Sequence, residues 1–95
     1  MENHFSKGLM AGLKTHQPWS ASQASQFCPD YRRGFVLGFS WNQAQITGDR
    51  QKAAWQAGIL TREYELDKTL VADFFSEQAN DPTVKSFFDG YEKGR

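Results

Sequence analysis

The chain has 95 residues, with eleven basic and eleven acidic side chains and no formal net charge. A chain of this length forms one domain, residues 1–95, because it cannot bury a second core. The cancelled charge excludes a global electrostatic attraction to nucleic acid or to an anionic membrane.

Charge, cysteine and hydropathy add three expectations. Up to Arg62 the chain carries seven basic and three acidic residues, and from Glu63 onward four basic and eight acidic ones, an asymmetry that is either chance scatter or a functional dipole. Cys28 is the only cysteine, which favours a reducing cytoplasm. The apolar run from Leu9 to Leu13 is too short for a signal peptide or a membrane span.

The first predicted helix runs from about Asn3 to Lys14, before the Thr15 to Pro18 stretch. The polar segment Ser20 to Gln26 lacks periodicity and is expected to be a loop with at most one helical turn. A long helix should open at Cys28-Pro29-Asp30, because proline fits a first helical turn and an acidic residue complements the helix dipole there.

Gly48 should end that helix in a left-handed conformation, and Asp49 should cap a third helix from Arg50 to about Tyr64. Asp67 should cap a fourth, Lys68 to about Gln78. Its apolar stripe comprises Leu66, Leu70, Val71, Phe74 and Phe75.

A last helix should follow the cap and proline at Asn80-Asp81-Pro82. Its buried face should consist of Val84, Phe87, Phe88 and Tyr91. The sequence contains no hairpin signal and no sustained alternation typical of strands. We therefore predict an all-α fold, a compact single-domain bundle of about five helices.

One pattern recurs in three of these helices: a large apolar residue, two spacers, a glycine, another large apolar residue, two spacers and a second glycine. The copies are Phe5 to Gly12, Tyr31 to Gly38 and Phe87 to Gly94, with a partial copy from Trp55 to Ile59 that has Arg62 at the second glycine position. Seven of the eight glycines belong to the pattern. Each glycine costs a helix interior about 0.8 to 1 kcal/mol relative to alanine, so a close contact must offset this cost.

Glycines four residues apart share one helical face, where another backbone or a flat ring can approach. We predict that this face mediates close packing between the helices; the alternative is a groove that receives an aromatic residue of a partner. These packing or groove positions are Gly8, Gly12, Gly34, Gly38, Gly58 and Gly90. Helix pairing in a membrane is disfavoured, because the segments are short and charged.

The sequence indicates no catalytic site, metal site or cofactor. His4, His16 and Cys28 are not at metal-ligand spacing, and no phosphate loop, dinucleotide fingerprint or serine elbow occurs. A nucleophile could be imagined from Cys28 and either histidine, but a cysteine before proline at a helix start is more often a packed or capping residue. The helix start would make that thiol open to chemical modification.

Two binding patterns also occur. Ala54, Gly58, Ile59 and Tyr64 partly match helix-turn-helix spacing, but Asp67 falls where an apolar residue is needed. The second pattern is a basic patch that could hold RNA by charge and stacking, or could equally be a solvated helix surface. Its candidate residues are Arg32, Arg33, Arg50, Lys52, Trp41 and Trp55.

The segments Phe5 to Lys14, Asp30 to Gly38, Thr47 to Arg50 and Ala54 to Arg62 resemble the YghW family of small bacterial proteins of unknown function. That resemblance implies a shared fold and no particular activity. Gly8 to Gly12, Cys28-Pro29 and Tyr31 to Phe35 are locally similar to ribosome modulation factor, a shorter and more basic helical protein that silences ribosomes.

The function is therefore expected to be that of a small, non-enzymatic, cytoplasmic interaction or regulatory protein with a protein partner. The alternative is a ribosome- or RNA-associated factor that binds through the basic patch.

Overall fold

A computed structural model describes residues 3–75 and 82–93, and within these ranges it contains helices and no strand. The all-α prediction is confirmed. The described residues form six α-helices and one 3₁₀ turn: α1 (His4–Leu13), α2 (Ala21–Ala24), α3 (Pro29–Thr47), α4 (Arg50–Glu63), α5 (Lys68–Ala72), η1 (Asp73–Phe75) and α6 (Pro82–Lys93).

The helix count exceeds the predicted five because the segment after Pro18 forms one capped turn, α2. Ser20 and Gln23 make a capping box there, in which each side chain bonds to the other residue's backbone amide. The predicted helix from Lys68 narrows into the 3₁₀ turn η1 after Ala72. The predicted end of that helix at Gln78, the cap residues Asn80 and Asp81, and the motif glycine Gly94 lie outside the described residues.

Local side-chain chemistry sets most helix starts. The carboxylate of Asp49 accepts a hydrogen bond from the Lys52 amide at 2.9 Å, and that of Asp67 accepts one from the Thr69 amide at 2.8 Å, as predicted. Helix α3 begins with Pro29 in its first turn, while Cys28 at the N-cap makes no side-chain capping bond.

Two residues with positive φ end the central helices. Gly48 (φ 72°) closes α3 as predicted. Glu65 (φ 56°) follows α4, where the amide of Leu66 bonds back to the carbonyl oxygen of Thr61 at 2.9 Å. This is a Schellman-type ending without glycine, and it turns the chain sharply away from α4.

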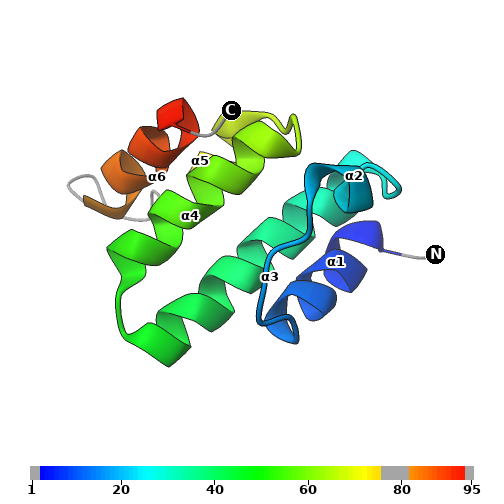
Figure 1. The fold of residues 1–95 in the computed structure, drawn as a ribbon, viewed down its shortest axis with the longest axis horizontal. Helices are drawn as coiled ribbons and strands as arrows, with labels where there is room; N and C mark the ends of the chain where they lie inside the picture. Colours follow the sequence, from blue (N-terminus) through cyan, green and yellow to red (C-terminus); the bar gives the residue numbers. More distant parts are fainter. Residues whose placement is uncertain (1–2, 76–81, 94–95) are drawn as a thin grey trace.

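Four long helices lie side by side in the order α6, α4, α3, α1 (Figure 1). Helices α1 and α3 form one pair and α4 and α6 form another, while the Gly48–Asp49 turn joins the pairs through an antiparallel α3–α4 hairpin. Within each pair the helices run parallel, so a long crossover must connect them. The first crossover contains α2, and the second contains α5 and η1.

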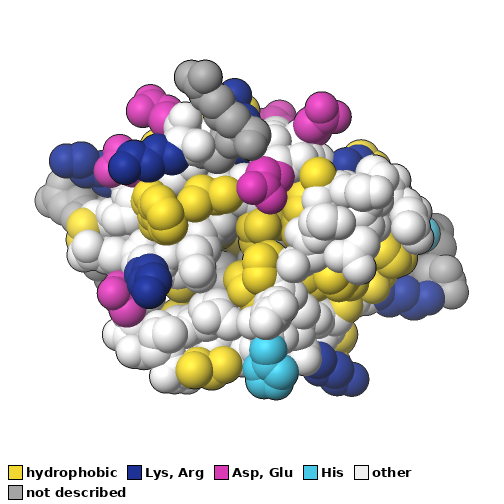
Figure 2. All heavy atoms as spheres, in the orientation of Figure 1, with side chains coloured by type: hydrophobic (Ala, Val, Ile, Leu, Met, Phe, Trp, Pro, Cys, Tyr) yellow, Lys and Arg dark blue, Asp and Glu magenta, His cyan; other side chains and the backbone are white. Residues whose placement is uncertain are grey.

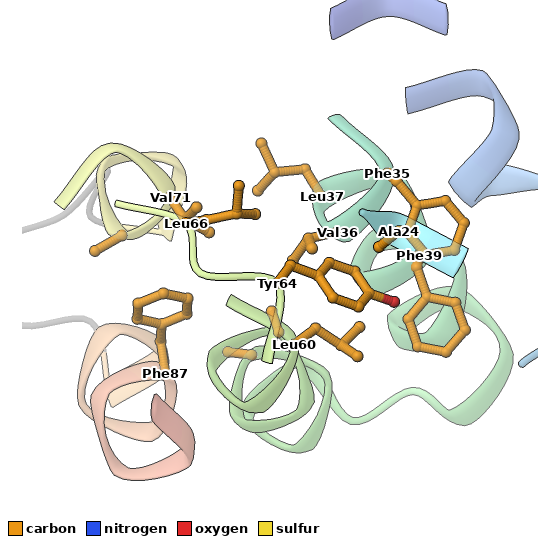
Figure 3. Close-up of a cluster of buried hydrophobic side chains, with 13 residues drawn as sticks. Ala24, Phe35, Val36, Leu37, Phe39, Leu60, Tyr64, Leu66, Val71 and Phe87 are labelled. Carbon is orange, nitrogen blue, oxygen red and sulfur yellow. The ribbon is translucent and has the colours of Figure 1, made fainter. Parts of the chain in front are cut away.

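The core lies between and within the two pairs (Figure 3). Phe35 and Phe39 of α3 lie on the side of Ala24, whereas Phe87 comes from α6. The ring of Tyr64 lies between these groups, and its hydroxyl donates a 2.7 Å hydrogen bond to the carbonyl oxygen of Trp19 in the first crossover. Trp19 in turn stacks on Phe35, with 3.8 Å between ring centroids.

Three residues expected on buried faces are instead exposed: Leu70, Phe74 and Phe88. The stripe from Leu66 to Phe75 is broken because α5 lasts little more than one turn before η1 changes the helical register. On α6, Phe87 takes the buried position and leaves the adjacent Phe88 pointing outward.

Figure 2 shows the face of the molecule seen in Figure 1, with side chains coloured by type. Hydrophobic side chains gather in the middle of this face, and most charged side chains lie towards its edges.

Candidate functional site

The glycines of the first pair lie where the α1 and α3 backbones meet. A Cβ atom on Gly8 would overlap the carbonyl oxygen of Tyr31, and one on Gly34 would overlap that of Phe5. One turn further along, Gly12 faces Phe35 and Gly38 faces Leu9 in the same reciprocal way. Because contacts on both helices advance in the same chain direction, these glycines define a parallel pair.

The second pair repeats this contact once. A Cβ atom on Gly58 would overlap the carbonyl oxygen of Phe87, and one on Gly90 would overlap that of Trp55. Where the second glycine would fall in α4, Arg62 reaches across: its Nε donates to the carbonyl oxygen of Tyr91 at 2.9 Å, and its guanidinium lies 4.5 Å from the Tyr91 ring centroid. At all six described motif positions the glycine face is covered by a neighbouring helix, so none of them forms an open groove.

The predicted basic patch is divided between the two ends of the α3–α4 hairpin. Arg32, in the first turn of α3, donates from Nη1 to the carbonyl oxygen of Tyr64 at 2.8 Å and thereby ties α3 to the end of α4. Arg33 pairs with Asp30 at 3.1 Å and lies 5.4 Å from the ring centroid of Phe5. Both side chains are half-buried and make structural contacts.

The other two patch cations, Arg50 and Lys52, lie in the first turn of α4 beside the end of α3. Arg32 is fifteen residues from Thr47 along α3, which at 1.5 Å per residue is roughly 22 Å. The two tryptophans also differ in exposure and position. Trp41 is 63% exposed on α3, whereas Trp55 is half-buried at the contact of α4 with α6. The structure does not bring the six residues into one surface.

A groove of about 820 Å³ lies between α1, α3 and η1 and reaches the first turns of α4 and α6. Its volume is within the range of small-molecule sites. Most of the lining is apolar. The lining residues are Phe5, Leu9, Leu13, Leu37, Ser40, Trp41, Ala44, Gln45, Gly48, Arg50, Ala53, Phe74, Phe75 and Thr83.

The groove is apolar at one end and polar at the other. Phe5 of α1 and Phe74 of η1 stack at 5.6 Å between centroids and form the apolar end. Gln45, Arg50 and Thr83 belong to the last turns of α3 and the first turns of α4 and α6, so the polar groups gather around the α3–α4 turn. Ser40 lies between these ends and donates to the carbonyl oxygen of Ala53 at 3.2 Å.

The sequence contains one indication of this groove that is not part of the patterns described above. Phe5, Leu9 and Leu13 are spaced four apart and therefore share one face of α1, next to the glycine face. Such a stripe is typical of a buried face, and here it lines the open groove.

Cys28 and His4 are the only thiol and imidazole that the described contacts bring together. The sulfur lies 3.4 Å from Nδ1 of His4 at the start of α3, and both side chains are exposed. Within residues 3–75 and 82–93, no three His, Cys, Asp or Glu side chains are grouped as a metal site requires. No described helix is long and apolar enough to cross a membrane.

The fold and the groove together define a small all-α protein built from two parallel, glycine-packed helix pairs with an apolar hollow beside them. A family model described as a protein of unknown function, DUF2623, matches residues 1–93. The chain belongs to this family. No solved structure matches it.

Proposed function

We propose that this chain is a non-enzymatic interaction or regulatory protein of the cytoplasm that binds an apolar segment of a protein partner in the groove. The observation that carries this proposal is the groove itself, an apolar hollow with the exposed ring of Trp41 at its margin. Exposed aromatic side chains beside a concave apolar surface are typical of interaction sites.

The chemistry of the lining favours binding over catalysis. Among the described residues, the lining has no imidazole, thiol or carboxylate. The hydroxyl of Ser40 is engaged with the Ala53 carbonyl oxygen. A general acid, base or nucleophile would have to be within hydrogen-bond reach of the bound molecule.

The test is partner capture that depends on the groove. Trp41→Ala and Phe74→Ala remove rings from the lining, and Ile46→Ala is the matched control because Ile46 is 60% exposed on the same helix as Trp41 but does not line the groove. We expect each groove variant to reduce recovery of a stoichiometric partner from lysate by roughly tenfold, as loss of an aromatic anchor does. Equal recovery by Trp41→Ala and Ile46→Ala, with both variants folded, would overturn the proposal.

The ribosome- or RNA-associated alternative stays a prediction, as do the more specific resemblances to the YghW family and to ribosome modulation factor. In this alternative, the two separated groups of basic-patch cations would each make a weak contact with phosphates, and such contacts strengthen as the salt concentration falls. Co-sedimentation with ribosomes at low salt that is lost in the double variant Arg50→Gln, Lys52→Gln would support it.

A further inference from the structure

The polarity gradient along the groove indicates the chemistry of a ligand. The apolar end has the stacked rings of Phe5 and Phe74, and the leucines of α1 continue this surface towards the middle. Along α3 and its C-cap the lining runs from Leu37 to Gly48, roughly 16 Å at the helical rise. This shape fits an elongated chain better than a compact ring system.

The polar end carries a positive charge. Arg50 lines the groove in the first turn of α4, where the helix dipole adds to its charge. The nearest carboxylate along the chain is that of Asp49. It does not line the groove, and it accepts a hydrogen bond from the backbone amide of Lys52. Arg50 also interacts within the chain, but a guanidinium has five N–H donors and can serve a second partner.

We infer that the groove binds a free long-chain carboxylate, with its alkyl chain between α1, α3 and η1 and its carboxylate at Arg50. The inference rests on the proposed function, since it concerns the same groove. The carboxylate would occupy the surface that binds the protein partner and would therefore compete with that partner. Burial of the alkyl chain supplies affinity, and the charge-assisted hydrogen bond at Arg50 selects the acid over an uncharged chain.

Calorimetric titration of the full chain with decanoate tests this inference, with 1-decanol as the uncharged chain of equal length. We expect decanoate to bind with one-to-one stoichiometry. Arg50→Gln should weaken decanoate roughly tenfold and leave 1-decanol unchanged. Lys85→Gln removes an exposed cation of α6 that does not line the groove, and should change neither titration.

A second pair of variants tests the place of binding. Ala44→Trp puts a large ring into the lining and should abolish binding, whereas Ile46→Trp makes the same change two residues away on α3, outside the lining. Melting of both variants verifies that they fold. Absence of decanoate binding, equal weakening by the two tryptophans, or equal loss of both ligands in Arg50→Gln would overturn the inference. Partner capture that still depends on Trp41 would then leave the proposed function standing.

Discussion

Both helix pairs are parallel and closely packed, but they differ in the number of glycines at the contact between their backbones. In α1–α3, four glycines bring two backbones together over two helical turns. In α4–α6 only Gly58 and Gly90 do so among the described residues, and Arg62 replaces the next contact with a hydrogen bond to Tyr91. The comparison teaches that one turn of backbone contact suffices to fix a parallel pair when a long side chain anchors the following turn.

The largest effect should come from filling the first pair. In Gly38→Leu the side chain would start inside the space of the Leu9 carbonyl oxygen, so the helices must separate. We expect a loss of about 3 kcal/mol or more in the free energy of unfolding, measured by urea denaturation followed by circular dichroism. Gly48→Ala is the control: its Cβ would meet no atom within 4 Å, and only the positive φ costs about 1 kcal/mol. Equal stability of Gly38→Leu and the parent would refute the packing role of that contact.

Filling the second pair should have a smaller and more local effect. Gly90→Ala places a methyl group against the Trp55 carbonyl oxygen, although alanine is normally favoured over glycine in a helix. We expect a loss of roughly 2 kcal/mol, because only the reciprocal contacts of Gly58 and Gly90 hold α6 this closely and the helix can shift. Hydrogen exchange should accelerate in α6 before it does in α1. Stabilisation by this alanine would show that the close contact is absent in solution.

Arg62→Gly makes the second pair more like the first. The substitution removes the hydrogen bond and the ring contact to Tyr91 and adds the conformational cost of a helical glycine. We expect a loss of about 1.5 kcal/mol in thermal or urea unfolding. Arg62→Lys keeps the charge and the helix propensity, so its free energy of unfolding should lie between that of the parent and that of Arg62→Gly. If the glycine variant proved more stable than the parent, the arginine would not be the anchor described.

Tyr64 connects the two helix pairs. Its replacement by phenylalanine should have the smallest effect of these substitutions on the free energy of unfolding at neutral pH. Burial, followed by the nearby Glu63 carboxylate, raises the pKa of the Tyr64 phenol. Above about pH 10 the unfolded chain loses this proton and the native chain keeps it, so the free energy of unfolding should fall as pH rises.

Urea denaturation between about pH 8 and 11 compares the parent with Tyr64→Phe. The variant should lose about 1 kcal/mol at neutral pH and should lack part of the alkaline fall in stability. An identical alkaline profile in both proteins would mean that another group is responsible.

The local features of the fold were predictable from the sequence, because they depend on neighbouring residues. Asp49, Asp67 and Gly48 act where their chemistry indicates, and the six glycines lie at close helix contacts. The partners of those glycines were not predictable, since the motif is nearly the same in every helix and does not encode which copy meets which. The assignment depends on the crossovers, and the first of these is fixed by Trp19 stacking on Phe35 and by Tyr64 bonding to Trp19.

The candidate site was less predictable than the fold. Charge alone grouped Arg32 with Arg50, although the predicted helix from Pro29 to Gly48 already places these two residues at its opposite ends. The groove was missed because Phe5, Leu9 and Leu13 have the spacing of a buried stripe. Whether such a stripe meets a neighbour depends on how far α5 and η1 extend over it, and that is a tertiary property.

Both partners of each pair come from the same half of the chain, with the Gly48–Asp49 turn at the boundary. During synthesis on the ribosome, domains generally fold from the N-terminus as chain becomes available. Here α1 and α3 can associate while the residues of α6 are still untranslated. The glycine contacts between α1 and α3 thus need no residue of the second half, whereas the hydrogen bond that holds the first crossover needs Tyr64 and forms only once α4 has been made.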